Sequence, residues 1–256
     1  MIDTVTFDLW NTLLIHEYHD DRVKNARIER MLDALNRNGH GYTIDEMLKA
    51  YDYTEEYLAG TWKEEKDLDI DEHLALFLTG LGLEVEEQLL DVIREPYMYA
   101  QFKFCPKIID GAIPLLAGIK SDGYRVGLIS NTGRTPGVTI RKILDRYGMS
   151  GYFDSMIYSN EVGYIKPNRK IFEIALEKLN ASAENTVHIG DSRLLDIYGA
   201  RSCGMSAILF DRYSAGFEKY AEKYYDAKGR RSEPDATVGS LEDITGVIKG
   251  LKQGRR

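Results

Sequence analysis

The chain has 256 residues, 43% of them hydrophobic, so it can bury one complete core and still supply a small second domain. Its formal charge of −8 and its isoelectric point near 5.3 exclude a broad electrostatic attraction to nucleic acid or anionic lipid. No apolar run reaches the ~20 residues of a membrane span, and two distant cysteines cannot build a disulfide framework. We therefore expect a cytoplasmic protein without nucleic-acid or membrane partners.

Short apolar and β-branched runs alternate with longer stretches of helical spacing along most of the chain. The predicted strands are residues 4–9, 124–130, 155–159, 186–190 and 206–210. The predicted helices between and around them are residues 107–121, 135–147, 169–179 and 194–203. This alternation predicts parallel βαβ units, hence an α/β fold with helices on both faces of the sheet.

The interval 16–104 holds several helical patterns and no convincing strand. Thr43 and Glu46 form a capping-box pattern, and Asp71 is the expected N-cap of the next helix. We therefore predict an α/β core made of residues 1–15 and 105–256 and an all-helical insert made of residues 16–104. Within the core, residues 213–235 are rich in Tyr, Lys and Glu, which indicates a surface helix and loop.

Polar side chains follow the predicted strands of the core, where parallel sheets bind their ligands. The residues in question are Asp8 and Asn11 after the first strand, Ser130 and Asn131 after the second, Lys166 before a proline, and Asp191 with Asp196 five residues beyond. Carboxylates that converge on one point repel each other and stay ionised together only around a cation. Mg²⁺ is the simplest cation for oxygen ligands, and carboxylates, a cation, a lysine and hydroxyl groups are what phosphoryl transfer requires.

These four segments, in this order and at these strand ends, resemble those of the haloacid dehalogenase superfamily, most of whose members are phosphatases. The similarity covers the α/β part, about two thirds of the chain, and implies a Rossmann-like parallel sheet. By this resemblance Asp8 is the nucleophile and a metal ligand, and the Trp10 backbone carbonyl is a second ligand. It also implies that Asp191 binds Mg²⁺ and that Asp196 acts from the edge of the metal site.

The same resemblance assigns the phosphate site and the insert. Asn11, Ser130 and Asn131 are expected to bind the phosphoryl group, and Lys166 to steady both the phosphate and the nucleophile. The helical insert follows the first motif directly and is similar to the family's cap, which closes over small substrates. The expected substrate is a small phosphorylated metabolite.

One position departs from the phosphatase pattern. The family's phosphatases usually carry a second aspartate two residues after the nucleophile, which protonates the leaving group, and this chain has Trp10 there. General acid-base catalysis is worth roughly 10²–10⁴ in rate, so we expect a phosphatase that is slow on poor leaving groups. His16, Glu17 or His19 could supply a surrogate acid.

Two other functions stay open at this point. A 2-haloacid dehalogenase is one, because those relatives also lack the second aspartate and place an aromatic residue there. Asp191 and Asp196 speak against it, since dehalogenases work without magnesium. A non-catalytic regulator that binds a phosphorylated metabolite or a protein partner is the other, and retention of Asp8 and Lys166 counts against it.

Some further patterns are interpreted as structural. Asp67, Asp69 and Asp71 imitate the opening of a calcium loop, but Glu72 and Leu78 occupy its glycine and final glutamate positions, so we expect a polar helix entry. His188 lies inside a predicted strand and is expected to be a satisfied buried histidine without a catalytic role. The tyrosines of the insert are expected mainly in its core: Tyr51, Tyr53, Tyr57, Tyr97 and Tyr99.

Overall fold

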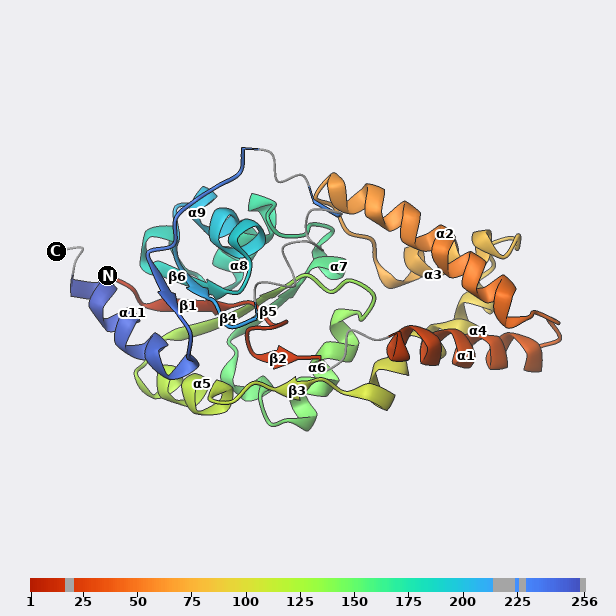
Figure 1. Ribbon diagram of the computed structural model, residues 1–256, viewed down its shortest axis with the longest axis horizontal. Helices are drawn as coiled ribbons and strands as arrows, with labels where there is room; N and C mark the ends of the chain where they lie inside the picture. The colour runs from red at the N-terminus through yellow and green to blue at the C-terminus, as the bar shows by residue number, and fades with distance from the viewer. Residues whose placement is uncertain (17–20, 214–223, 226–228, 254–256) are drawn as a thin grey trace.

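The computed structural model describes residues 1–16, 21–213, 224–225 and 229–253 (Figure 1). Its centre is a six-stranded parallel sheet in the order β5–β4–β1–β6–β7–β8. The strands are β1 (Thr4–Phe7), β4 (Arg125–Ser130), β5 (Ser155–Tyr158), β6 (Thr186–Gly190), β7 (Ser206–Phe210) and β8 (Ala236–Val238). The predicted α/β class is confirmed, and five of the six strands lie where the sequence indicates them; β8 is an addition.

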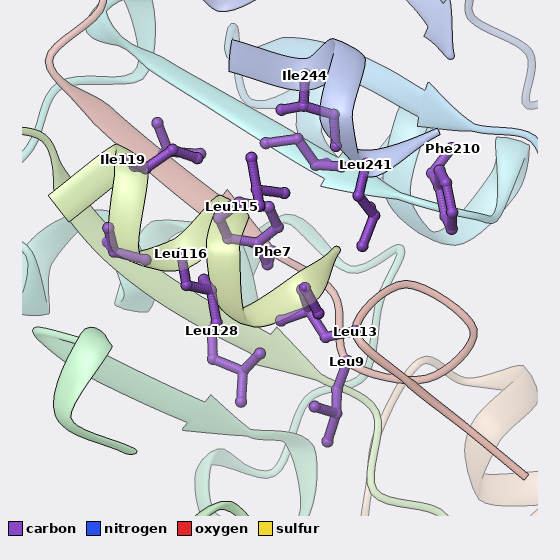
Figure 2. Close-up of a cluster of buried hydrophobic side chains, with 14 of the residues drawn as sticks. Phe7, Leu9, Leu13, Leu115, Leu116, Ile119, Leu128, Phe210, Leu241 and Ile244 are labelled. Carbon is purple, nitrogen blue, oxygen red and sulfur yellow. The ribbon is translucent and has the colours of Figure 1, made fainter. Parts of the chain in front are cut away.

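Helices cover both faces of this sheet because its strands are apolar on both sides. One face packs on α5 (Ala112–Ser121), α6 (Gly137–Arg146) and α11 (Ile244–Gln253), and Figure 2 shows Phe7 among the leucines and isoleucines of this core. The other face packs on α8 (Arg169–Lys178) and α9 (Gly199–Ser202). The shorter helical segments of the core are η2 (Ser150–Tyr152), α7 (Ser159–Val162), η3 (Ala183–Asn185), η4 (Arg193–Tyr198) and η5 (Leu241–Asp243).

Two predicted helices differ from the structure. Residues 107–121 begin as the short strand β3 (Lys107–Ile108), and α5 starts only at Ala112, after Gly111 adopts a left-handed conformation with φ 89°. Residues 194–203 are not one α-helix, because η4 is π-helical and α9 follows it. In η4 the Ile197 N–H donates to the Ser192 carbonyl five residues earlier. Such π-helical turns are frequent at functional sites.

The predicted insert, residues 16–104, is here called the helical insert. Its regular elements in the described residues are helices: α1 (Arg22–Arg37), α2 (Ile44–Lys63), α3 (Ile70–Gly80), α4 (Glu87–Met98) and the 3₁₀ segment η1 (Tyr99–Phe104). They enclose a hydrophobic cluster of their own, separate from the two sides of the sheet. Of the insert tyrosines, Tyr51 and Tyr97 lie in this cluster, whereas Tyr53 and Tyr57 are exposed.

The caps of the insert helices follow local sequence rules. The predicted capping box between Thr43 and Glu46 is present at the start of α2. At α3 the N-cap is Asp69 and not the predicted Asp71, because Asp69 pairs with Glu72 in a second capping box. A capping box needs a glutamate three residues after the N-cap residue. Glu72 stands three residues after Asp69, whereas Leu74 stands three residues after Asp71. This polar helix entry agrees with the interpretation of the acidic run.

Backbone pairing joins the insert region to the core at two places, and side-chain contacts such as that of Arg134 with Glu55 add to them. At the first, β2 (Leu14–Ile15) pairs antiparallel with β3. The segment that leads from the core into the insert therefore lies beside the segment that leads back to the core. At the second, Lys66 forms an antiparallel bridge with Tyr164, and the Asp67 N–H donates to the Gly163 carbonyl at 3.1 Å. The end of α2 therefore rests on the loop that leads into Lys166. In the described part of the chain, no helix has both the length and the hydropathy needed to cross a membrane.

Candidate active site

The three central strands deliver their polar ends to one edge of the sheet. β1 lies between β4 and β6, with Phe7 in register with Leu128 on one side and Ile189 on the other. Asp8 follows β1, Ser130 ends β4, and Asp191 follows β6. Because neighbouring parallel strands end at the same edge, residues far apart in the sequence meet there.

Lys166 lies buried between two carboxylates. Its Nζ atom is 2.6 Å from Asp8 Oδ1 and 2.6 Å from Asp196 Oδ1, and all three residues are at most 5% exposed. Burial alone would lower the pKa of Lys166, but the carboxylates of Asp196 and Asp8 outweigh it and raise the pKa above its ordinary value. The lysine is therefore a fixed positive charge beside the Asp8 carboxylate.

Asp8 is held at both carboxylate oxygens, by Lys166 at Oδ1 and by Thr12 at Oδ2. Thr12 donates its hydroxyl to Asp8 Oδ2 at 3.1 Å, and the Asp8 N–H donates to the Ile189 carbonyl at 2.8 Å. Burial raises the pKa of Asp8 to about 6, although the Lys166 charge opposes the rise. Thr12 was not among the predicted site residues. The sequence feature that could have identified Thr12 is its position four residues after Asp8, because the turn that follows β1 brings the two side chains together.

Asp196 is the most heavily bonded carboxylate of the site. Besides Lys166, it meets His188 Nε2 at 3.1 Å and accepts the Ser192 N–H at 3.0 Å. Burial opposes its ionisation, yet Lys166 and His188 hold the pKa of Asp196 below its usual range. His188 is fully buried and also bonded to the Thr6 hydroxyl, as expected for a satisfied structural histidine. Burial lowers the pKa of His188, which favours its neutral form.

Gly190 makes room for the Asp196 side chain. A Cβ atom at residue 190 would overlap the Asp196 carboxyl group. The glycine that ends β6 thus lets this carboxylate fold back against the strand and reach Lys166.

Asp191 and Asn11 lie together. The Asn11 amide donates to Asp191 Oδ2 at 3.2 Å, and Asn11 adopts a left-handed backbone with φ 60°, which asparagine tolerates better than most residues. Burial and the charges of Asp8 and Asp196 raise the pKa of Asp191 well above its usual value. The Asn11 side chain therefore binds the Asp191 carboxylate. Its role in phosphate binding stays a prediction.

The donor set fits a divalent cation. Asp8, Asp191 and Asp196 each place a carboxylate oxygen within 4.8 Å of the other two, and all three are buried. Burial, and after it the charges of the neighbouring carboxylates, raises the pKa values of Asp8 and Asp191, and a cation among the three would relieve the repulsion between them. Buried carboxylate oxygens are the ligands of hard cations.

Asn131 links the loop after β4 to the loop that holds Lys166. Its side-chain Nδ2 donates to the Lys166 carbonyl at 3.1 Å, and its Oδ1 accepts the Lys166 N–H at 2.8 Å. The amide thus fixes the backbone at Lys166. Ser130 is fully buried, and its hydroxyl donates to the Asn131 carbonyl at 3.3 Å. Both residues lie at the predicted edge of the sheet, next to the lysine.

Trp10 is partly buried and forms part of the loop that leaves β1. Its indole stacks on the His16 imidazole, with ring centroids 4.8 Å apart and planes 20° apart. No group of this side chain can give a proton to a leaving oxygen. Of the three predicted surrogate acids, His16 lies against Trp10 through this stack. Glu17 and His19 lie outside the described residues.

Asp67 joins the insert to the loop after β4 and to the start of α7. Its carboxylate accepts the Ser159 hydroxyl at 2.5 Å, the Thr132 hydroxyl at 3.4 Å and the Trp62 indole N–H at 2.9 Å. No local pattern indicates this junction, because Thr132 and Ser159 lie 65 and 92 residues away from Asp67.

The chain belongs to the haloacid dehalogenase-like hydrolase family, whose family model matches residues 2–204. The predicted family, the α/β fold and the assignment as a hydrolase are therefore confirmed.

Two curated relatives have the same name. Glyceraldehyde 3-phosphate phosphatase of Methanothermobacter thermautotrophicus is 34% identical over 82% of this chain and 85% of its own length. The protein of that name from Pyrococcus abyssi is 28% identical over 97% of this chain and 94% of its own length.

Solved structures show the same fold. A haloacid dehalogenase-type phosphatase from Thermococcus onnurineus is 25% identical, covers 97% of this chain and 99% of its own, and gives a TM-score of 0.59. A 2-haloacid dehalogenase from Pseudomonas syringae is 22% identical, covers 98% of this chain and all of its own, and gives a TM-score of 0.69. At that identity the second likeness concerns the fold alone.

Proposed function

We propose that the protein is a Mg²⁺-dependent phosphatase that hydrolyses a small phosphorylated metabolite through an aspartyl-phosphate intermediate on Asp8. The observation that carries the proposal is the buried contact of Asp8 with Lys166, at 2.6 Å, next to the carboxylates of Asp191 and Asp196. A carboxylate fixed beside a permanent cation, at the end of the central strand, has what a nucleophile for phosphoryl transfer needs. The curated relatives named glyceraldehyde 3-phosphate phosphatase support a three-carbon sugar phosphate as the kind of substrate.

In this proposal the residues of the site have distinct roles. Asp8 attacks phosphorus through a carboxylate oxygen, and Thr12 and Lys166 orient that carboxylate. Lys166 also neutralises charge on the phosphoryl oxygens, which is the main source of catalysis in phosphoryl transfer. Asn11, Ser130 and Asn131 line the phosphate side of the site, and the Asn131 amide keeps Lys166 in place.

Asp8, the Trp10 carbonyl and Asp191 would hold the Mg²⁺ ion, with Asp196 at the edge of the site. A bound Mg²⁺ ion would neutralise charge that builds up on the phosphoryl group. Asp196 has a second task in any case, because its oxygens already anchor Lys166 and the Ser192 backbone.

We also propose that the helical insert acts as a cap over this site, with the division between core and cap at residues 16 and 104. The bridge between Lys66 and Tyr164 and the bonds of Asp67 support this proposal, because they join the insert to both loops that flank the phosphate site. Trp10 leaves the first step without a carboxylic acid for the leaving group, so the enzyme should be slow on alkyl phosphates.

The dehalogenase alternative has one observation in its favour, which is the aromatic Trp10 two residues after Asp8. Asp191 is the counter-argument, since a third buried carboxylate would only repel Asp8 in an enzyme that uses no metal. A regulator without catalysis would have no use for a lysine buried against the Asp8 carboxylate.

One assay separates the three functions. Wild type, Asp8→Asn and the surface control Asp33→Asn are each given 4-nitrophenyl phosphate and 2-chloropropionate, with Mg²⁺ and with chelator. Phosphate release that needs both Mg²⁺ and Asp8, and is unaffected in the control, is the expected result. Chloride release that is insensitive to chelator would replace the proposal with a dehalogenase. Absence of both activities in the wild type would replace it with a regulator.

A further inference from the structure

Described residues between β7 and β8 pack on the insert and contact the site. Tyr224 meets Trp62 of α2 edge-to-face, with ring centroids 5.5 Å apart, in a buried cluster with Leu58 and Ile165. Arg230 forms an ion pair with Glu65, just after α2. Figure 1 shows a short piece of this chain beside the end of α2. The described residues of this connection, 224–225 and 229–230, are thus fixed to the same part of the insert that rests on the Lys166 loop.

The next residue, Tyr225, points its hydroxyl group at the phosphate loop. The Asn131 Nδ2 atom donates to the Tyr225 oxygen at 3.4 Å, and the same Nδ2 donates to the Lys166 carbonyl at 3.1 Å. The Tyr225 oxygen is the acceptor in this contact, so its own proton is not used there. Among the described residues, none accepts a hydrogen bond from this hydroxyl.

The charges around Tyr225 are those of the active site. Burial raises the pKa of Tyr225 well above its ordinary value; the Asn131 bond and Lys166 oppose the rise, and the charges of Asp67 and Asp196 add to it. The phenol therefore remains protonated at any working pH. The Tyr225 hydroxyl can donate a hydrogen bond, but it does not transfer its proton.

In-line displacement determines where such a donor is useful. The leaving oxygen lies on the far side of phosphorus from the attacking Asp8 carboxylate. Asp8 approaches from the sheet, so the leaving oxygen faces the insert and the residues packed on it. Tyr225 comes from that side, since its neighbour Tyr224 is seated on Trp62. Trp10, which occupies the usual position of the acid, has no acidic group, and its indole stacks on His16.

We infer that Tyr225 is a catalytic residue that donates a hydrogen bond to the leaving-group oxygen of the phosphorylated substrate. The inference rests on the proposed function. As Asp8 forms its bond to phosphorus, the bond between phosphorus and the leaving oxygen breaks and its electron pair stays on that oxygen. The phenol stabilises this charge without losing its proton, and a proton from water completes the alcohol.

The test is the dependence of kcat/KM on the leaving group. Wild type, Tyr225→Phe and the remote control Tyr152→Phe are assayed with 4-nitrophenyl phosphate, phenyl phosphate and glyceraldehyde 3-phosphate. A hydrogen bond to the leaving oxygen is worth most where most charge develops, that is, for the poorest leaving group. We expect Tyr225→Phe to lose ~3-fold with the nitrophenyl ester and ~100-fold with the alkyl ester, and Tyr152→Phe to lose nothing.

An equal loss on all three substrates, or no loss, would overturn the inference, because a residue that only supports the fold cannot distinguish leaving groups. Thermal unfolding of Tyr225→Phe checks that the variant is folded at the assay temperature. Asp8→Asn keeps the two claims separate. If it retains phosphatase activity, the proposed function fails; if it is inactive and Tyr225→Phe shows no leaving-group effect, only the role of Tyr225 fails.

Discussion

Lys166 and Asp196 are joined by a buried ion pair, with Nζ 2.6 Å from Oδ1, and this pair fixes the lysine beside Asp8. The sequence separates the two residues by 30 positions. A lone lysine in this place would lose its charge to burial, and the second carboxylate prevents that. Asp196, together with Asp8, thus keeps the lysine of the site charged, and several predictions depend on it.

Gly190→Ala should inactivate the enzyme by displacing Asp196. The added methyl group would overlap the Asp196 carboxyl, so that carboxyl must move away from Lys166 and His188. We expect kcat to fall at least ~10²-fold, as for loss of an electrostatic catalytic group. The matched control is Gly118→Ala in α5, where nothing lies within 4 Å of the added atom. It should keep full activity and gain about 0.5–1 kcal/mol of stability. An active Gly190→Ala enzyme would contradict the role given to Asp196.

Asp191→Asn should stabilise the protein in chelator and abolish its response to Mg²⁺. Without a cation, burial and the charges of Asp8 and Asp196 disfavour the Asp191 carboxylate, whereas a neutral amide still accepts the Asn11 bond through its oxygen. Relief of like-charge repulsion on the order of 1 kcal/mol corresponds to a melting temperature roughly 2–4 °C higher. Calorimetry in chelator and in Mg²⁺ measures both effects. A variant that melts below the wild type in chelator would speak against the repulsion.

Asp8 should make the metal-free protein less stable as the pH rises. Its folded-state pKa of about 6 exceeds the ordinary value of 3.8, so the folded chain binds this proton more tightly than the unfolded chain. The contribution is complete below about pH 4 and is lost as the pH rises through about 6; its size is at most about 3 kcal/mol. Urea unfolding in chelator should therefore show the stability of wild type falling relative to Asp8→Asn between these pH values. A constant difference would refute the shift.

Trp10→Asp should accelerate the hydrolysis of alkyl phosphates, provided that the loop accepts the loss of the stack on His16. The new carboxylic acid would protonate the leaving oxygen, an effect of roughly 10²-fold at the lower end of general acid catalysis. Trp10→Asn is the matched control, because asparagine has nearly the same shape as aspartate but no carboxylic acid. Equal rates for the two folded variants would show that the missing acid does not limit turnover.

Asp67→Asn should loosen the insert from the core. The Asp67 carboxylate accepts hydrogen bonds from Trp62, Ser159 and Thr132, and it is almost fully buried. An amide replaces one acceptor oxygen with a donor, so we expect a loss of about 1–3 kcal/mol in unfolding free energy. A higher KM should accompany it, because Asp67 holds the residue next to Asn131. Asp33→Asn, on the exposed face of α1, should change neither value by more than the error. Unchanged stability and KM in Asp67→Asn would show that this junction is unimportant.

The sequence predicts most of the sheet because strands and strand ends are local features. Apolar runs that stop at Asp8, Ser130 and Asp191 are visible in any short window, and the parallel order brings such ends together. The capping box at Thr43 is equally local. By contrast, the N-cap at Asp69 depends on where α3 begins, and β8 is too short a run to be recognised.

What the sequence by itself determined is the kind of chemistry: acidic, amide and lysine side chains at the edge of a parallel sheet. What only the tertiary structure decided is which atoms meet. The contacts of Asp67 with Ser159 and of Asn131 with Tyr225 span 92 and 94 residues, and such distances in the chain carry no local pattern. They arise because burial forces each polar group to find a partner, and only the packed fold determines which partner is within reach.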